Sequence, residues 1–290
     1  MNFLTTPLIV IVGETASGKS ALAMDLARRF NGELICADAT TVYCGFDIGS
    51  AKPSEKDRAE VPHHLLDVAG AEEGFTAARF KQLADRATID ISARGKLPIM
   101  VGGSGLYIDS VLYDYQFKAL PNTDERDVLN TMSLADLLVL AHERGLDTSS
   151  VDTANSRRVV RLIETNGVHT KRSELRPNTC VLGVQINREL LRSQVKKRVA
   201  AMLEAGLENE VKTLASRYGW SGEAMKAIGY REWQSYFAGQ ATLEQTADRI
   251  VTDTMRLAKK QRTWFQRNNS IQWVSDPKKA VDIVTTFLNN

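Results

Sequence analysis

In the N-terminal third of the chain, short apolar runs typical of buried strands alternate with segments whose apolar residues recur at helical spacing. Residues 8–12 form a short β-branched run that ends at a glycine, and residues 20–30 place Ala and Leu at helical spacing. A second apolar run covers 33–37, so the segment predicts a strand, a helix and a strand in succession. Helical spacing over about 76–94, followed by an apolar run over 97–101, extends the pattern. Strands that alternate with helices indicate a parallel α/β sheet, which binds ligands at the carboxyl ends of its strands.

The pattern changes after residue 113. Residues 114–178 contain polar, turn-rich stretches and short helical patterns, which indicate a helical insertion. Residues 181–186 again resemble a strand of the first domain, and from residue 188 the apolar spacing is helical almost to the end. The expected fold class is therefore α/β, with a parallel sheet flanked by helices, a helical insertion domain and C-terminal helices. We expect a catalytic core at 1–113 plus 179–290 and the insertion at 114–178.

Composition narrows the class of protein further. The chain has 290 residues, 43% of them hydrophobic and 25% charged, with a formal net charge of +2. Its longest apolar runs are far shorter than the ~20 residues that span a bilayer, and its first residues lack a basic signal-peptide region. Three cysteines without a CxxC pair indicate neither a disulfide framework nor a zinc site. We expect a cytoplasmic, monomeric protein that makes no membrane contact.

The strongest motif is GETASGKS at residues 13–20, which matches the P-loop pattern GxxxxGK[ST]. It follows a predicted strand and precedes a predicted helix, as the mechanism of phosphate binding requires. Backbone N–H groups at such a helix N-terminus form an anion nest, the lysine adds positive charge, and the serine hydroxyl can hold Mg²⁺. The predicted diphosphate-binding residues are Gly13, Thr15, Ala16, Ser17, Gly18, Lys19 and Ser20, with Ser20 as the metal ligand.

Two more features follow strands at the same predicted edge of the sheet. Asp38 follows the second strand, and its carboxylate has two open roles, binding Mg²⁺ through water or accepting a proton from an acceptor substrate. The third strand leads into a second glycine loop, GGSG at 102–105, in which Ser104 can donate its hydroxyl to a diphosphate. Glycines also cluster in turns for backbone reasons alone. Two glycine loops that converge at one edge nevertheless favour a ligand-binding interpretation.

Basic residues gather in two places. Between Arg256 and Arg267 there is no acid, and Trp264 and Phe265 lie inside the run, a composition that suits phosphate contacts with nucleotide stacking. A solvated helix face with an aromatic core anchor explains the run equally well. Because the net charge is only +2, any nucleic-acid surface must be a local patch. The candidate nucleic-acid-binding residues are Arg157, Arg158 and Arg161 in the insertion, and Lys259, Lys260, Arg262 and Arg267 near the C-terminus.

Several motifs, taken together and in order, resemble those of the tRNA dimethylallyltransferases, also called tRNA isopentenyltransferases. They cover nearly the whole chain, and their joint order is far more specific than the P-loop. The matching stretches are GETASGKS (13–20), DATTVYCGFDIGSAKP (38–53), PHHLLD (62–67), VGGSGLY (101–107), NSRRVVRLIE (155–164), GLENEV (206–211), AIGYRE (227–232) and KKQRTWFQR (259–267).

The resemblance implies transfer of a dimethylallyl group from dimethylallyl diphosphate to the exocyclic amine of the adenosine just 3′ of the tRNA anticodon, with Mg²⁺ as cofactor. Asp38 matches the family's catalytic aspartate, which accepts the proton of the amine. The P-loop with Lys19 and Ser20, together with Ser104 and Arg231, matches the positions that bind the departing diphosphate. The helical insertion and the basic C-terminal helices are expected to clamp the anticodon arm while the target base flips into a channel.

Some positions depart from the family pattern. Glu14 stands where proline is usual and puts a carboxylate near an anion site, and Ala39 and Thr41 replace a serine and a glutamine that contact the acceptor. Three alternatives stay open. An adenylate isopentenyltransferase would act on a free nucleotide and would not need the insertion or the basic helices. A small-molecule kinase would bind ATP at Lys19, and a non-catalytic tRNA-binding protein would tolerate the departures.

Overall fold

The structure is a computed structural model that describes residues 6–117, 123–149, 151–168 and 171–289. It divides into two compact units, residues 1–112 with 175–290 and residues 113–174. The sequence-based boundaries lie one residue away at the first junction and four residues away at the second. Each unit is described by itself below.

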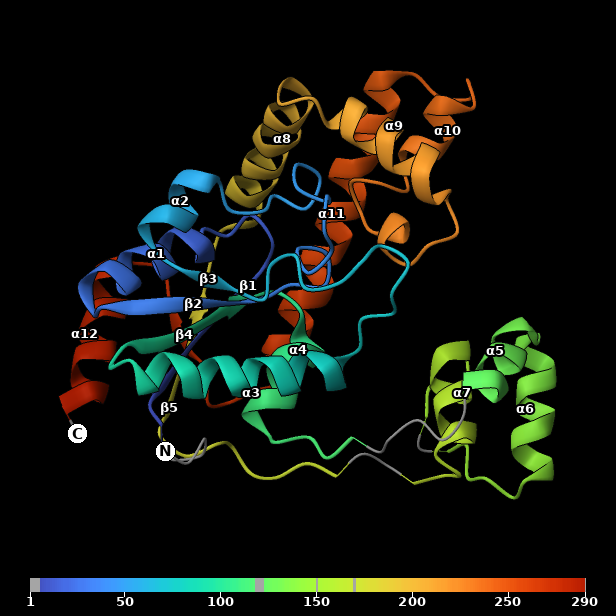
Figure 1. The fold of residues 1–290 in the computed structure, drawn as a ribbon, viewed down its shortest axis with the longest axis horizontal. Coiled ribbons are helices and arrows are strands. Elements are labelled where there is room, and N and C mark those ends of the chain that lie inside the picture. Colours follow the sequence, from blue (N-terminus) through green and yellow to red (C-terminus); the bar gives the residue numbers. More distant parts are fainter. Residues whose placement is uncertain (1–5, 118–122, 150, 169–170, 290) are drawn as a thin grey trace. The chain divides into compact units, whose positions relative to one another are not determined.

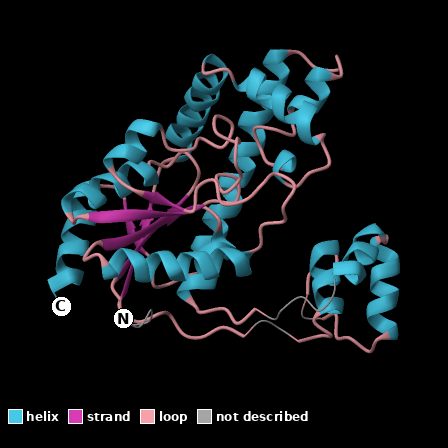
Figure 2. Ribbon diagram, in the orientation of Figure 1, coloured by secondary structure: helices cyan, strands magenta, loops and turns pink. Residues whose placement is uncertain are grey.

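The first unit contains a six-stranded sheet in which every neighbouring pair is parallel, in the order β3-β2-β4-β1-β5-β6. The helices surround the strands in Figure 2. The expected α/β fold class is confirmed. All residues of the three inner strands from the N-terminal third are buried, as is typical of strands covered on both faces. The strands are β1 (Leu8–Gly13), β2 (Gly32–Ala37), β3 (His63–His64), β4 (Leu97–Gly102), β5 (Thr179–Val184) and β6 (Gln272–Val274).

Helices cover both faces of this sheet (Figure 1). α1 (Lys19–Arg29) and α12 (Pro277–Asn289) share one core cluster with Ile9 and Ile11 of β1. α3 (Ala77–Ala93) packs against β2, β4 and α4 (Gly105–Leu112) on the other face. The order of the strands explains this division. The chain runs outward from β1 to β2 and then returns to β4, so right-handed crossovers place α1 and α3 on opposite faces.

The C-terminal helices build a second core at the carboxyl edge of the sheet. α8 (Arg188–Glu204), α9 (Leu207–Tyr218) and α11 (Leu243–Phe265) enclose Phe46, from the loop after β2, together with Tyr230. The short α10 (Trp233–Phe237) adds Trp233, which is fully buried. α2 (Glu55–Glu60) lies in the same long segment between β2 and α3. The predicted helical character of the second half is present, although β6 interrupts it.

The second unit is a small helical domain. α5 (Thr123–Thr131), α6 (Leu134–Glu143) and α7 (Ser156–Glu164) pack around a core that includes Leu137, Val159 and Ile163. α7 carries its apolar residues on one face and its arginines on the other, which is the pattern of a helix that is half-covered by its neighbours. No helix in the described parts of the two units is both long enough and apolar enough to cross a membrane.

Candidate active site

The loop between β1 and α1 has the geometry of a phosphate-binding loop. Gly18 precedes α1 with φ 92°, and Ala16 also has a positive φ of 62°, so successive N–H groups turn toward one side. The N-cap of α1 is Gly18, which has no side chain to accept from the first turn, so the N–H groups of that turn stay available to an anion. Ser17 is buried, and its Oγ has no hydrogen-bond partner in the structure. A diphosphate would satisfy these donors.

Lys19 supplies the positive charge of this loop. Its Nζ lies 3.4 Å from the carbonyl oxygen of Glu14, so the side chain folds back over the loop. Burial lowers the pKa of Lys19 to about 8; the negative charge of Asp38 opposes this shift, and the positive charge of Arg198 adds to it. Both groups therefore lie close enough to Lys19 to influence its charge.

The register of the sheet brings three loops together at one edge. Gly102 of β4 pairs with Val12 of β1 on one side and with Ala37 of β2 on the other, so the loops that follow these three strands begin side by side. A Cβ at Gly102 would lie 2.0 Å from the carbonyl oxygen of Ala37, which explains why a glycine is needed. The N–H of Ser104 donates to the same oxygen at 3.2 Å. Because β4 lies between β1 and β2, the Ser104 loop begins between the P-loop and Asp38 at this edge.

Asp38 is half-buried at the end of β2. Its Oδ1 accepts the N–H of Thr40 at 2.8 Å and that of Thr41 at 3.4 Å, which fixes the direction of the carboxylate through a local turn. Its charge also acts on Tyr107 of α4, whose phenol pKa is raised mainly by burial and further by Tyr43 and Asp38. The charge of Asp38 therefore acts on both Lys19 and the phenol of α4.

Arg198 of α8 is a site residue that sequence reasoning missed. Its Nη1 lies 3.3 Å from Oγ1 of Thr15, and burial lowers the pKa of its guanidinium while the charge of Asp38 opposes that shift. One signal was present in the sequence. Leu191, Val195, Arg198 and Met202 follow the spacing i, i+4, i+7, i+11 of an apolar stripe, so a charged residue occupies a position that should face the protein interior.

Arg231 has different neighbours from those that the resemblance implies. Its Nε lies 3.0 Å from Glu232 and its Nη2 2.8 Å from Asp253 of α11, which also binds Arg256 at 2.8 Å. These carboxylates raise the pKa of the Arg231 guanidinium against the opposing effect of burial. Gly229 donates its N–H to Glu232 at 2.8 Å, so the turn belongs to the same network. A direct role of Arg231 in diphosphate binding stays a prediction.

Two motifs of the C-terminal half support the loop that follows Asp38. The carboxylate of Glu210 in α9 accepts the N–H groups of Asp47, Ile48 and Gly49 at 3.2, 2.8 and 3.0 Å. Tyr230 donates its hydroxyl to the same carboxylate at 2.9 Å, and a Cβ at Gly49 would lie 2.6 Å from the Tyr230 ring. These residues hold the loop in place through backbone contacts.

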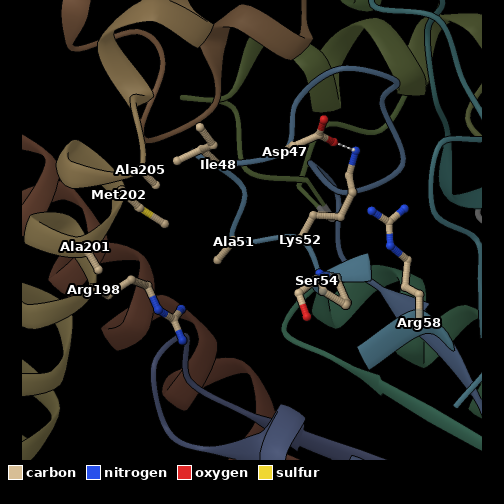
Figure 3. A pocket seen from close by; sticks show the side chains of 11 residues that line it. Asp47, Ile48, Ala51, Lys52, Ser54, Arg58, Arg198, Ala201, Met202 and Ala205 are labelled. Atoms are coloured by element: carbon tan, nitrogen blue, oxygen red, sulfur yellow. Dashed lines mark hydrogen bonds and ion pairs between the residues drawn. The ribbon is translucent and has the colours of Figure 1, made fainter. Parts of the chain in front are cut away.

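A pocket of about 360 Å³ opens between this loop and α8 (Figure 3). Arg198 lines it and also reaches the P-loop, so the pocket adjoins the site. Lys52 lies on the opposite side, where its Nζ pairs with Asp47 at 2.5 Å and with Asp67 at 2.6 Å. The wall of the pocket therefore combines an apolar helix surface around Met202 with fixed cationic groups.

The basic run of α11 divides between the surface and the site. Lys259 and Lys260 are exposed, whereas Arg262 turns inward and binds the buried carboxylate of Glu14 at 3.0 Å. Arg267 is exposed and stacks over the ring of Trp264, with its guanidinium carbon 4.3 Å from the centroid. The unusual carboxylate of the P-loop is thus paired with a residue that the sequence assigned to tRNA contact.

The arginines of the second unit lie on α7. Arg157 and Arg158 are exposed, and Arg158 lies 3.8 Å from Asp152. Arg161 is half-buried and lies 3.6 Å from the buried Glu164, which also pairs with Arg126. Arg161 therefore contributes to the fold of this unit, while its predicted contact with tRNA, like those of Arg157 and Arg158, stays a prediction.

Direct metal ligation was predicted at Ser20, and binding of Mg²⁺ through water was left open for Asp38. The Ser20 side chain is exposed at the start of α1, and no hydrogen bond within the described chain engages its hydroxyl. Nowhere in the described residues do three or more His, Cys, Asp or Glu side chains gather into a group that could hold a metal ion. All three cysteines are unpaired thiols, and Cys44 is exposed.

Comparison with known proteins identifies the family. A family model described as IPP transferase matches residues 41–268. A tRNA dimethylallyltransferase of Anoxybacillus flavithermus is 38% identical over 92% of this chain and 89% of its own length. Another, from Geobacter metallireducens, is 39% identical over 98% of this chain and 97% of its own length.

Solved structures agree with the family model. A tRNA isopentenylpyrophosphate transferase of Bacillus halodurans has a TM-score of 0.75 at 32% identity, covering 98% of this chain and 96% of that one. A eukaryotic dimethylallyltransferase acting on tRNA has a TM-score of 0.82 at 25% identity, covering 99% of this chain and 80% of that one. The P-loop, the neighbouring aspartate and the paired glycine loops therefore stand in an enzyme, and the chain belongs to the IPP transferase family.

Proposed function

We propose that this enzyme transfers a dimethylallyl group from dimethylallyl diphosphate to the exocyclic amine of the adenosine 3′ of the anticodon in tRNA. The observation that carries the proposal is the placement of one carboxylate, Asp38, within electrostatic reach of two cations, Lys19 and Arg198, at the edge where three loops meet. A prenyl transfer needs both the cations and the carboxylate. The cations stabilise the diphosphate that leaves the reacting carbon, and the carboxylate accepts the proton of the amine that attacks it.

The donor's diphosphate is assigned to the P-loop. As the allylic carbon–oxygen bond breaks, negative charge grows on the leaving diphosphate, and the N–H groups before α1 with Lys19 and Arg198 stabilise it. The unpartnered Ser17 hydroxyl and Ser104 of the second loop supply neutral donors. The pocket beside Arg198 is the space we assign to the approach of the donor. Because these groups are fixed in the fold, they need little reorganisation during the reaction.

Magnesium fits this site through oxygen ligands. The exposed Ser20 hydroxyl, together with diphosphate oxygens, would hold Mg²⁺, which prefers oxygen and keeps several of its waters. When bound, the ion would neutralise charge on the diphosphate. The chain's own residues bind and orient the leaving group around it.

The acceptor amine is assigned to Asp38. The lone pair of an adenine amine is delocalised into the ring, so the amine attacks the allylic carbon more readily when a base accepts its proton. In the balanced step, the nitrogen–carbon bond forms, the carbon–oxygen bond to diphosphate breaks, and the N–H proton moves to the Asp38 carboxylate. The two backbone N–H groups on Oδ1 hold the carboxylate in its direction.

The tRNA is assigned to the exposed cations of α11 and α7. Lys259 and Lys260 are exposed on α11, which also reaches the P-loop, and Arg267 is exposed in the turn after this helix. Arg157 and Arg158 are exposed on α7. Phosphate contacts of this kind position an RNA without reading its sequence. We propose that the enzyme acts as a monomer in the cytoplasm.

One transfer assay tests the function. The protein is incubated with Mg²⁺, labelled dimethylallyl diphosphate and either unmodified tRNA or AMP. Label in tRNA is the expected result, and label in AMP alone would identify an adenylate isopentenyltransferase. Consumption of ATP without transfer would identify a kinase. Binding of tRNA with no transfer under any of these conditions would leave only a tRNA-binding protein.

A salt titration tests the tRNA surface. The double variant Lys259→Ala, Lys260→Ala removes two exposed cations without touching the Arg262–Glu14 pair. We expect weaker tRNA binding and a salt dependence reduced by about 1.4–1.8 in log–log slope, since each phosphate contact contributes roughly 0.7–0.9. Lys278→Ala, Lys279→Ala at the exposed start of α12 is the matched control. An unchanged slope in the α11 variant would mean that these lysines are only a solvated helix face.

A further inference from the structure

A buried amide joins the two glycine loops of the site. Gln261 of α11 is only 8% exposed, although it follows two exposed lysines in the chain. Its Oε1 accepts the N–H of Thr15 in the P-loop at 2.8 Å, and its Nε2 donates to the carbonyl oxygen of Gly103 at 3.1 Å. The side chain therefore connects the P-loop to the residue before Ser104.

Near neutral pH, only an amide of this length can make both bonds. Thr15 presents an N–H donor and Gly103 a carbonyl acceptor, so the bridging group must accept at one end and donate at the other. A carboxylate accepts at both ends and would repel the Gly103 oxygen. Asparagine is one methylene shorter, and methionine has the right length but makes neither bond. The orientation of the Gln261 amide follows from its partners.

Both loops are built to admit this side chain. A Cβ at Gly103 would lie 2.3 Å from Nε2 of Gln261, so glycine is needed there because of the amide. Thr15 is held twice, at its N–H by Gln261 and at its Oγ1 by Arg198 at 3.3 Å. The neighbouring residue of α11, Arg262, binds Glu14 in the same loop. Helix α11 thus fixes the backbone of the P-loop from one side.

We propose that Gln261 is a positioning residue which sets the separation between the P-loop and the Ser104 loop, so that both contact one diphosphate. That the diphosphate belongs to dimethylallyl diphosphate rests on the proposed function. Binding of a diphosphate group by the two loops can be tested without it. Misplacement of a binding group by about 1 Å can lower a reaction rate by roughly 10²-fold, so a short link between two loops has a large effect. Gln261 acts through Thr15 and Gly103 and need not touch the substrate.

Direct binding of inorganic diphosphate with Mg²⁺, measured by calorimetry, tests the proposal without relying on transfer. For Gln261→Met we expect affinity at least tenfold below that of the wild type, with affinity for tRNA unchanged. Two controls separate this effect from helix stability. Gln266→Met makes the same change at the exposed end of α11, and Thr246→Val removes a buried 2.9 Å bond to Thr242 at its beginning. Both should bind diphosphate as the wild type does.

Gln261→Glu adds the pH dependence of diphosphate affinity as a readout, which a change in packing alone would not alter. Near pH 8 the introduced carboxylate cannot donate to Gly103, so binding should be as weak as in Gln261→Met. At about pH 5.5 burial beside a carbonyl favours the protonated form, which accepts from Thr15 and donates to Gly103 like the amide. The ratio of wild-type to variant affinity should then fall toward one. Comparison with the wild type at each pH cancels the protonation of diphosphate itself.

The outcomes are distinct. Wild-type diphosphate affinity in Gln261→Met, equal weakening in Thr246→Val, or a pH-independent ratio for Gln261→Glu would each overturn the positioning role. If Gln261→Met does not fold, the acid-dependent recovery of Gln261→Glu still decides the question. Failure of the wild type to modify tRNA would refute the proposed function and leave the diphosphate result intact. In the transfer assay, Gln261→Met should raise the KM for dimethylallyl diphosphate and lower kcat, with the KM for tRNA unchanged.

Discussion

Replacement of Asp38 by asparagine tests the chemical core of the proposed reaction. The amide oxygen of Asn can still accept the N–H groups of Thr40 and Thr41, so the turn at 2.8 and 3.4 Å survives while the proton acceptor is lost. General-base catalysis contributes roughly 10²–10⁴ in rate. At about 1.36 kcal/mol per decade this loss raises the barrier by about 2.7–5.4 kcal/mol. We therefore expect kcat to fall at least about a hundredfold.

The assay is single-turnover transfer of labelled dimethylallyl to tRNA, with diphosphate binding as the second readout. The Asp38 charge raises the pKa of Lys19, so its loss lowers that pKa further. Binding is therefore measured at about pH 6.5, which favours the ammonium form. Binding should persist while transfer is lost. Asp276→Asn is the matched control, because its Oδ1 makes the same kind of turn to Lys278 at 2.9 Å. Transfer by Asp38→Asn within about fivefold of wild type, less than 1 kcal/mol, would refute the base.

Two further predictions concern charge and loop support. Because burial lowers the pKa of Lys19 to about 8 and the ammonium form binds anions, diphosphate affinity should decline as the pH rises through about 8. In Lys19→Arg the guanidinium stays charged, so calorimetry should show a flatter decline of diphosphate affinity with pH. An equally steep decline would refute the attribution of the pH dependence to Lys19. Glu210→Gln should lower the free energy of unfolding in urea by about 1–3 kcal/mol, because an acceptor of three backbone N–H groups is impaired. Glu208, on the same helix as Glu210, accepts one hydrogen bond from Tyr236, so Glu208→Gln should lower the free energy of unfolding less. Equal losses in the two variants would contradict this account.

Local patterns predicted the part of the site that depends on local backbone geometry. The P-loop requires left-handed conformations at fixed positions between a strand and a helix, so its glycines appear in the sequence as a motif. Asp38 follows an apolar run, and the end of a parallel strand is a place that the pattern identifies. The β1, α1, β2, α3 and β4 boundaries accordingly differ from the predicted ones by at most one residue.

Contacts between distant segments were not predictable in this way. Gln261 lies 246 residues from Thr15, and nothing in a basic helical run distinguishes an amide that faces inward. The only sequence signal for Arg198 was that a charged residue interrupts the apolar stripe of α8. The edge strands β3 and β6 are two and three residues long, too short for a period of two to appear. Sequence reasoning therefore finds loops with special backbone geometry before it finds the side chains that hold them.

The Glu14–Arg262 pair explains how this chain accommodates a carboxylate in the loop to which we assign the donor's diphosphate. Glu14 is 5% exposed, and Nη2 of Arg262 is 3.0 Å away, so the charge of the buried carboxylate is largely compensated. Arg262→Ala leaves that charge buried and unpaired. The pair is partly solvated, so we expect a loss of about 1–3 kcal/mol in unfolding free energy together with weaker diphosphate binding.

Glu14→Gln in the Arg262→Ala background removes the unpaired charge and should restore diphosphate affinity. Restoration would show that Arg262 serves the P-loop, because a residue that served only tRNA would leave diphosphate binding unchanged in both variants. Together with the results for Lys259→Ala, Lys260→Ala and for Gln261→Met, it would divide the basic run of α11 by function. Lys259 and Lys260 would bind RNA, and Gln261 and Arg262 would hold the donor loops. Adjacent residues of one helix would then act on opposite substrates, since successive side chains of a helix point about 100° apart.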